Sequence, residues 1–288
     1  MKIGLSVKPF SSGGYAEFGD KLYEKLREHG YACIDYNIAD TSVDVYNAPW
    51  KQVYDFLSRQ RELARSADIE ISQVHGPWRW PPRDLTEEDR RERMEKMKIS
   101  VRATAALGCQ NLVIHPIMPY GISDINTENA QKTWDMNISF MSELLEEAKR
   151  YGVTVCLENM PMHNFSLSKP KDILKFVRTV DDPYFKICLD TGHVAAFENL
   201  SLADAVRELA DEIRVLHVHD TKEGKDLHLV PTLGVIDWRA FANALWDIEF
   251  SGVFSLESNL PRELSGEDFE DAGKQLFKIA EEIIAEKN

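Results

Sequence analysis

The sequence predicts an α/β fold, a single (β/α)8 barrel in which eight parallel strands alternate with eight helices. Short apolar runs rich in β-branched residues alternate with longer amphipathic stretches, which is the pattern of parallel strands joined by helical crossovers. Six of these runs end in a histidine, an aspartate or a glutamate. The chain has 288 residues, close to the roughly 250 residues of such a barrel.

The strands are expected where apolar runs stand between turn residues. In order along the chain these runs are IGLSV, ACIDY, IEISQVH, NLVIH, TVCLE, FKICLD, RVLHVH and GVFSLE. They cover residues 3–7, 32–36, 69–75, 111–115, 154–158, 185–190, 214–219 and 252–257.

A helix is expected after each strand, where apolar residues recur with helical spacing. The ranges are 16–29, 50–66, 86–107, 128–151, 170–180, 202–209, 238–246 and 266–285. Gly30, Gly108 and Gly152 follow helices as C-terminal glycines do, and Ser201 and Asp237 stand at preferred N-cap positions.

An open doubly wound sheet is the alternative arrangement of alternating strands and helices. It usually carries a glycine-rich phosphate-binding turn after its first strand, and the residues Ser11-Ser12-Gly13-Gly14 do not fit that motif. No linker or low-complexity segment interrupts the alternation. We therefore expect residues 1–288 to form one domain.

Composition and charge exclude several classes of protein. Hydrophobic residues make up 43% and charged residues 28% of the chain, as in an ordinary globular protein. The formal net charge of -14, without a cluster of lysine and arginine, argues against nucleic-acid binding. The four scattered cysteines indicate free thiols, and neither a signal peptide nor a membrane span is recognisable. We expect a cytoplasmic protein with no nucleic-acid or membrane partner.

The strand ends carry the candidate chemistry, because the active site of such a barrel is built at the carboxyl ends of its strands. In chain order these side chains are His75, His115, Glu158, Asp190 with His193, His217 with His219, and Glu257. A shared cation keeps several buried carboxylates ionised together, so the pattern predicts a divalent metal: Mn, Co, Mg or Zn. Each residue alone is compatible with a structural role in the core.

At these residues the sequence resembles the xylose isomerase-like TIM barrels, a family that includes sugar phosphate isomerases and epimerases and the endonuclease IV type of abasic-site nuclease. The resemblance spans almost the whole chain. It is carried by VCLENMP, CLDTGHVAAF, VLHVHDTK, HLVPTLGVIDW and FSLES. It implies one metal held by Glu158, Asp190, His217 and Glu257, with His193 beside the substrate.

The resemblance also implies a reaction. In the epimerases the two metal-bound glutamates, here Glu158 and Glu257, face opposite sides of the sugar and move a proton through an enediolate. The chain departs from the epimerases after His217, where their sugar-binding arginine is missing and Lys222 and Lys225 are the nearby cations. It also has Thr232-Leu233-Gly234 in place of their G-E-G.

The expected function is therefore a metal-dependent isomerase or epimerase acting on a small sugar or keto-sugar, with Glu158 and Glu257 as catalytic residues. The substrate-binding candidates are His75, His115, His193, Trp78, Lys222 and His228. Trp78 belongs to a loop, residues 76–83, that could wall the pocket by stacking on a sugar or could merely pack the barrel top.

Three alternatives remain open at this point. A dehydratase or lyase acting on a keto-sugar begins with the same proton removal. An endonuclease IV-like phosphodiesterase would use additional ligands that have counterparts in His75, His115, His193, Asp226 and His228. A non-enzymatic barrel would be expected to lack one of the four ligands, and none is missing. The sequence is compatible with a homo-oligomer.

Overall fold

The computed structural model describes residues 1–261 and 263–285 and confirms the (β/α)8 barrel. Its eight strands are parallel and follow the order β7-β6-β5-β4-β3-β2-β1-β8. The strands are β1 (Lys2–Val7), β2 (Cys33–Asn37), β3 (Glu70–His75), β4 (Asn111–Ile114), β5 (Thr154–Glu158), β6 (Phe185–Asp190), β7 (Ile213–His217) and β8 (Val253–Leu256).

The sheet closes on itself where β7 meets β8. Val218, the residue after β7, bridges to Leu256 of β8. Its amide donates to the Ser255 carbonyl at 2.8 Å, and its own carbonyl accepts from the Glu257 amide at 2.9 Å. These bonds lie at the carboxyl ends of the two strands, beside the mouth of the barrel.

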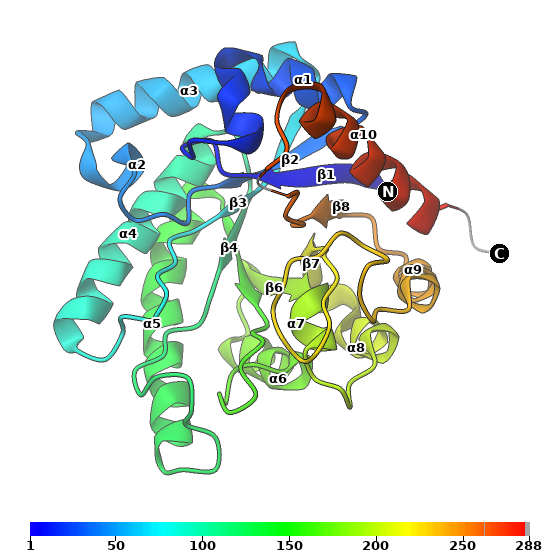
Figure 1. Cartoon of the computed structure of the whole chain (residues 1–288). Helices are drawn as coiled ribbons and strands as arrows, with labels where there is room; N and C mark the ends of the chain where they lie inside the picture. Colours follow the sequence, from blue (N-terminus) through cyan, green and yellow to red (C-terminus); the bar gives the residue numbers. More distant parts are fainter. Residues whose placement is uncertain (262, 286–288) are drawn as a thin grey trace.

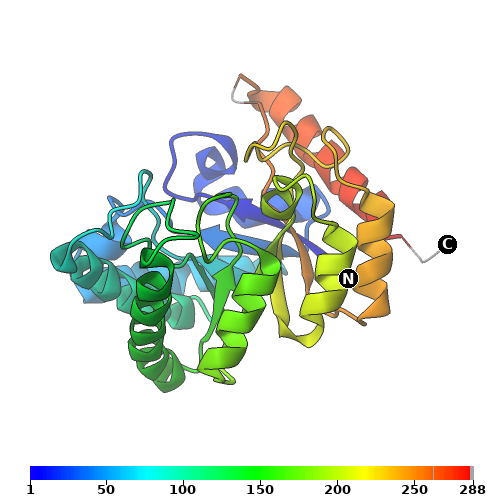
Figure 2. The same cartoon turned by 90° about the horizontal axis from the view of Figure 1, so that it is seen from below.

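Helices surround the strands in both views (Figures 1 and 2). They are the 3-10 helix η1 (Gly14–Lys21), α1 (Leu22–Glu28), α2 (Asp44–Asn47), α3 (Trp50–Ser66), α4 (Glu87–Ala106), α5 (Asn129–Tyr151), α6 (Pro170–Val180), α7 (Thr191–Ala195), α8 (Leu202–Leu209), the 3-10 helix η2 (Ala210–Glu212), α9 (Trp238–Asp247) and α10 (Gly266–Ile283). None of the helices in the described part of the chain is long and apolar enough to cross a membrane. All four cysteines are buried and free of disulfide bonds.

The first helix differs from the sequence-based expectation. A single helix was expected over residues 16–29, whereas the structure has η1 followed by α1. Gly19 adopts φ 52° and ψ -124°, a left-handed conformation that glycine takes readily and that interrupts the helix. The short helices α2 and α7 were not expected from the hydrophobic pattern, because four or five residues are too few to show a helical period.

The interior of the barrel is polar on one side and apolar on the other. Successive side chains of a strand point to opposite faces of the sheet. The residue two positions before the last inward-facing residue of a strand therefore lies on the same face, one layer deeper in the barrel. On β4 to β7 this deeper layer is the apolar cluster Val113, Cys156, Cys188 and Val215. On β2, β3 and β8 it is polar and fully buried: Asp35, Gln73 and Ser255.

Candidate metal centre

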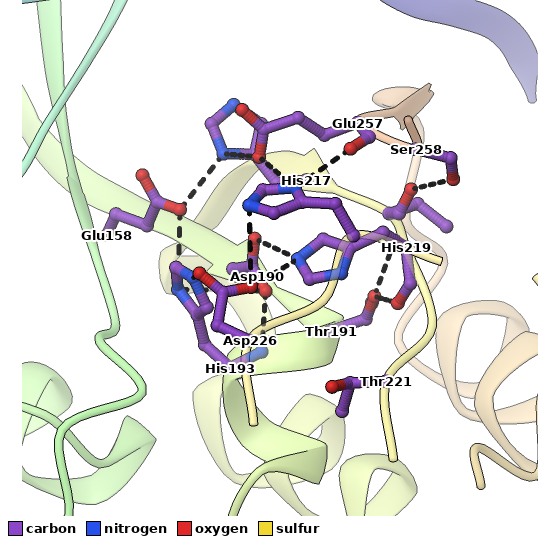
Figure 3. Close-up of polar contacts among 12 residues, drawn as sticks. Glu158, Asp190, Thr191, His193, His217, His219, Thr221, Asp226, Glu257 and Ser258 are labelled. Atoms are coloured by element: carbon purple, nitrogen blue, oxygen red, sulfur yellow. Dashed lines mark hydrogen bonds and ion pairs between the residues drawn. The ribbon is translucent and has the colours of Figure 1, made fainter. Parts of the chain in front are cut away.

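The predicted ligands meet at the mouth of the barrel, where the last residues of neighbouring strands place their side chains side by side. Glu158 ends β5, Asp190 ends β6, His217 ends β7 and Glu257 directly follows β8. Figure 3 shows these side chains directed toward one another. Each follows an apolar run that is buried in the sheet, and this burial fixes the position of its backbone.

The four predicted ligands form one compact group. Each offers one ligand atom, and these atoms lie within 4.8 Å of one another. The Nδ1 atom of His217 lies 3.0 Å from Oε1 of Glu158 and 3.2 Å from Oε2 of Glu257. Glu158, Asp190 and His217 are at most 1% exposed, whereas the side chain of Glu257 is 14% exposed. The group is thus buried except at Glu257, whose side chain is partly exposed to solvent.

A second group shares Glu158 with the first. The Nε2 atom of His115 lies 2.9 Å from Oε2 of Glu158, and Nε2 of His75 lies 3.7 Å from the same oxygen. The two rings meet edge to face. His75, His115 and Glu158 together satisfy the spacing required of a metal-binding group.

A third group lies beside Asp190 and contains His193, His219, Asp226 and His228. His193 and His228 each place Nε2 3.4 Å from an oxygen of Asp226. The Nε2 atom of His219 lies 3.0 Å from Oδ2 of Asp190, which connects this group to the first.

The helix α7 positions Asp190 and His193. Asp190 is its N-cap residue and accepts a hydrogen bond from the His193 amide at 2.7 Å. The backbone of Asp190 is held on both sides by the amide of Asn159, at 2.8 and 3.1 Å. A Cβ atom at Gly192 would lie 2.0 Å from the His219 ring. Glycine is therefore required at this position for the start of α7 to approach His219.

The loop that carries Asp226 and His228 is organised by the buried carboxylate of Asp220. This carboxylate accepts hydrogen bonds from the amides of Thr232 and Val235 and from the indole of Trp238, at 2.9 to 3.0 Å. A Cβ atom at Gly234 would lie 2.2 Å from the same carboxylate. The Thr232-Leu233-Gly234 segment therefore closes a turn around Asp220.

Nearby carboxylates raise the pKa of two of the imidazoles, whereas burial lowers the pKa of His115 to about 4. Burial lowers the pKa of His193, but Asp190 and Asp226 outweigh burial and raise that pKa to about 10. Burial also opposes the charged form of His228, yet Asp226 and Glu257 raise its pKa to about 9. Burial raises the pKa of Glu158, but the imidazoles of His217 and His115 outweigh burial and hold it well below its usual range. Such a set of carboxylates is suited to a cation.

A cavity of about 500 Å³ opens above these groups. Its lining includes Glu158, Glu257 and all but one of the predicted substrate-binding residues: His75, Trp78, His115, His193 and His228. The exception is Lys222, which is exposed and lies outside this lining. Trp78 packs edge to face on His115, with ring centroids 4.3 Å apart. Arg79, the residue after Trp78, forms an ion pair with Glu92 at 2.6 Å and is not part of the cavity lining.

Three residues of this site were not predicted from the sequence. Lys8 and Asn37 line the cavity from the ends of β1 and β2, and Asp35 lies beneath it. Asp35 and Asn37 alternate with the outward-facing Ile34 and Tyr36, so the period of two in β2 is the signal that could have revealed them.

Comparisons with known proteins agree with the barrel fold. Residues 23–278 match the family model of the xylose isomerase-like TIM barrel. An uncharacterized protein of Methanocaldococcus jannaschii is 27% identical over 100% of this chain and 93% of its own length. D-psicose 3-epimerase of Enterocloster bolteae is 24% identical, over 89% of this chain and 82% of its own. The crystal structure of a D-tagatose 3-epimerase-like protein, 25% identical, covers 99% of this chain and 98% of its own with a TM-score of 0.75.

Proposed function

The chain belongs to the xylose isomerase-like TIM barrel family, and on this basis we propose that it is a metal-dependent isomerase or epimerase acting on a small sugar or keto-sugar. One observation carries the proposal. Glu158, Asp190, His217 and Glu257 form a compact ligand group, and Glu158 and Glu257 also line the cavity above it. The similarity to D-psicose 3-epimerase supports the choice of a ketose as substrate.

The donor set fits a divalent cation. Three carboxylates and one imidazole suit Mn, Co or Mg and are compatible with Zn. The raised pKa values of His193 and His228 show that the neighbouring carboxylates attract positive charge. When bound, such an ion polarises a substrate carbonyl and stabilises the oxyanion that develops on it.

The two glutamates are the proposed acid and base. A proton on the carbon next to the carbonyl is removed by one carboxylate, and the enediolate receives a proton from the other. Glu257 is the more accessible of the two, with 14% of its side chain exposed, whereas Glu158 is 1% exposed and 2.9 Å from His115. Both face the cavity, so either can reach a bound sugar. A dehydratase or lyase acting on a keto-sugar would begin with the same proton removal.

Exchange of the substrate proton with solvent tests this function. We expect the protein, supplied with Mn, Co or Mg, to incorporate deuterium next to the carbonyl of at least one ketose in a panel that includes D-psicose and D-tagatose. Nuclear magnetic resonance of the sugar measures the exchange directly and does not depend on which product forms. Absence of exchange across the panel would contradict the proposal.

The second candidate is a phosphodiesterase at abasic DNA, favoured by one observation. The second and third groups, with His75, His115, His193, Asp226 and His228, surround the first and could complete a site for several metals. In-line phosphodiester hydrolysis uses more than one metal to hold the attacking and leaving oxygens, whereas enediolate chemistry needs one. The net charge of -14 weighs against a polyanionic substrate.

The metal content decides between these two functions. We expect one tightly bound metal per chain, because the proposed proton transfer needs only the first ligand group. Elemental analysis of the purified protein gives the count, and an abasic-site duplex provides the activity assay. Two or three stoichiometric metals together with cleavage of that duplex would favour the nuclease.

Substitution of His75 or His115 tests the role of the second group. If these side chains bind substrate hydroxyls, His75→Asn and His115→Asn should raise the KM for the ketose while the metal content stays at the wild-type level. His163→Asn is the matched control, because His163 packs on Phe197 and is outside the cavity lining. Loss of the metal in either variant would instead make the histidine a ligand.

A further inference from the structure

A buried carboxylate lies directly beneath the proposed metal centre. Asp35 of β2 is 0% exposed, in the polar half of the deeper barrel layer. Removing a carboxylate from water is costly unless a charged or hydrogen-bonding partner compensates. Neither oxygen makes a hydrogen bond of good geometry, and the described residues offer no lysine or arginine ion pair to Asp35. The contact made by Oδ2 is with His217, whose Nε2 atom lies 3.2 Å away.

The two nitrogens of the His217 ring face opposite layers. Nδ1 points toward the first ligand group, 3.0 Å from Glu158 and 3.2 Å from Glu257. Nε2 points down to Oδ2 of Asp35 at 3.2 Å, and among the described residues it makes no hydrogen bond of good geometry. The ring is also stacked on His75, with 4° between the planes. A neutral imidazole carries one proton, so the partner of one nitrogen decides which nitrogen can bind a metal.

We propose that Asp35 is a positioning residue of the metal centre. When an ion takes the Nδ1 lone pair, the proton of His217 is on Nε2, and the Asp35 carboxylate would accept it and fix this tautomer. This inference rests on the metal centre of the proposed function. Carboxylates that accept the second N–H of a metal-bound histidine orient the ring and raise its basicity.

The other residues of this deeper layer do not take the place of Asp35 beside His217. Gln73 uses its side-chain amide to donate to the Leu216 carbonyl at 3.2 Å. Ser255 is equally buried, and its hydroxyl has no partner among the described residues. The opposite side of the layer is the apolar cluster of Val113, Cys156, Cys188 and Val215.

The fold alone does not account for Asp35. A carboxylate kept for packing would stabilise the protein whether or not metal is present. Because Oδ2 lies 3.2 Å from Nε2 of the equally buried His217, removing Asp35 breaks a buried pair and lowers stability under either role. The two roles differ instead in the metal affinity of a folded variant, which only a positioning role lowers.

Two substitutions and one control test the proposal. Asp35→Leu removes the acceptor at similar volume, and Asp35→Asn keeps one acceptor oxygen without the charge. We expect about 10- to 100-fold weaker Mn binding in Asp35→Leu, the usual effect of losing such a partner, and a smaller loss in Asp35→Asn. Urea unfolding of each metal-free variant measures its folded fraction, so that Mn affinities are compared between folded proteins. Ser255→Ala, in the same layer, should leave Mn affinity unchanged.

Unchanged Mn affinity in folded Asp35→Leu would overturn the assignment. If Asp35→Leu does not fold, the weaker Mn binding expected of Asp35→Asn carries the test. A wild-type protein that binds no metal would contradict the proposed function instead. In that case the proton resonance of His217 Nε2 still reports on the contact, since it should be protected from exchange in the wild type and lose that protection in Asp35→Leu, which has no acceptor. Equal protection in both would overturn the contact.

Discussion

Prolonged treatment with a strong chelator is expected to abolish turnover, and addition of Mn, Co or Mg is expected to restore it. The proposed reaction creates an enediolate, and the first ligand group offers three carboxylates and one imidazole, which do not stabilise an anion by themselves. The measurement is ketose turnover before chelation, after chelation and after each metal is returned.

The chelation experiment needs a check on the fold, because metal binding can also contribute to stability. Circular dichroism of the metal-free protein should show the helices and strands retained, since most buried apolar residues form one large cluster that includes none of the four predicted ligands. Full activity in protein that elemental analysis shows to be free of metal would refute the metal dependence.

Replacement of either proposed catalytic glutamate, Glu158 or Glu257, by glutamine is expected to lower turnover by about 100-fold or more, the usual contribution of general acid–base catalysis. Glutamine keeps the shape and one ligand oxygen of Glu158 or Glu257 but cannot accept the proton. A substrate analogue should still bind, because the remaining cavity lining is unchanged. The assays are steady-state turnover and exchange of the substrate proton with deuterium.

Glu147→Gln is the matched control for these variants. Glu147 is also a buried glutamate, 7% exposed, but it pairs with Arg102 on the outer helices. Its replacement should leave turnover at the wild-type level. Near wild-type exchange of the substrate proton in Glu158→Gln or Glu257→Gln would show that the residue in question is not the base.

The barrel and its first ligand group could be predicted because both depend on local patterns. An apolar run of four to six residues predicts a buried strand, and the polar residue that ends it must then lie at the mouth. Glu158 after TVCL and Asp190 after FKICL are examples, and the structure places them together as expected. Asp226 and His228 lie in a loop, and only the family resemblance indicated them.

The missed features depend on contacts between distant parts of the chain. Asp35 interrupts an otherwise apolar strand, and its meaning depends on His217, which lies far along the sequence and faces it across the barrel. Asp220 organises a loop through amides 12 and 15 residues further on, which no hydrophobic period reveals. Lys222 was expected at the substrate because it is the nearest cation after His217, but spacing along the chain does not determine which way a loop turns.

The closure of the barrel beside Val218 would connect a bound metal to the local stability of the barrel. His217 and Glu257 lie on the two sides of this seam, next to the bonds that Val218 makes with Ser255 and Glu257. An ion bound by both side chains would cross-link the carboxyl ends of β7 and β8. Amide hydrogen exchange at Val218 and Glu257 should therefore slow when metal is added, which makes the seam a local reporter of occupancy.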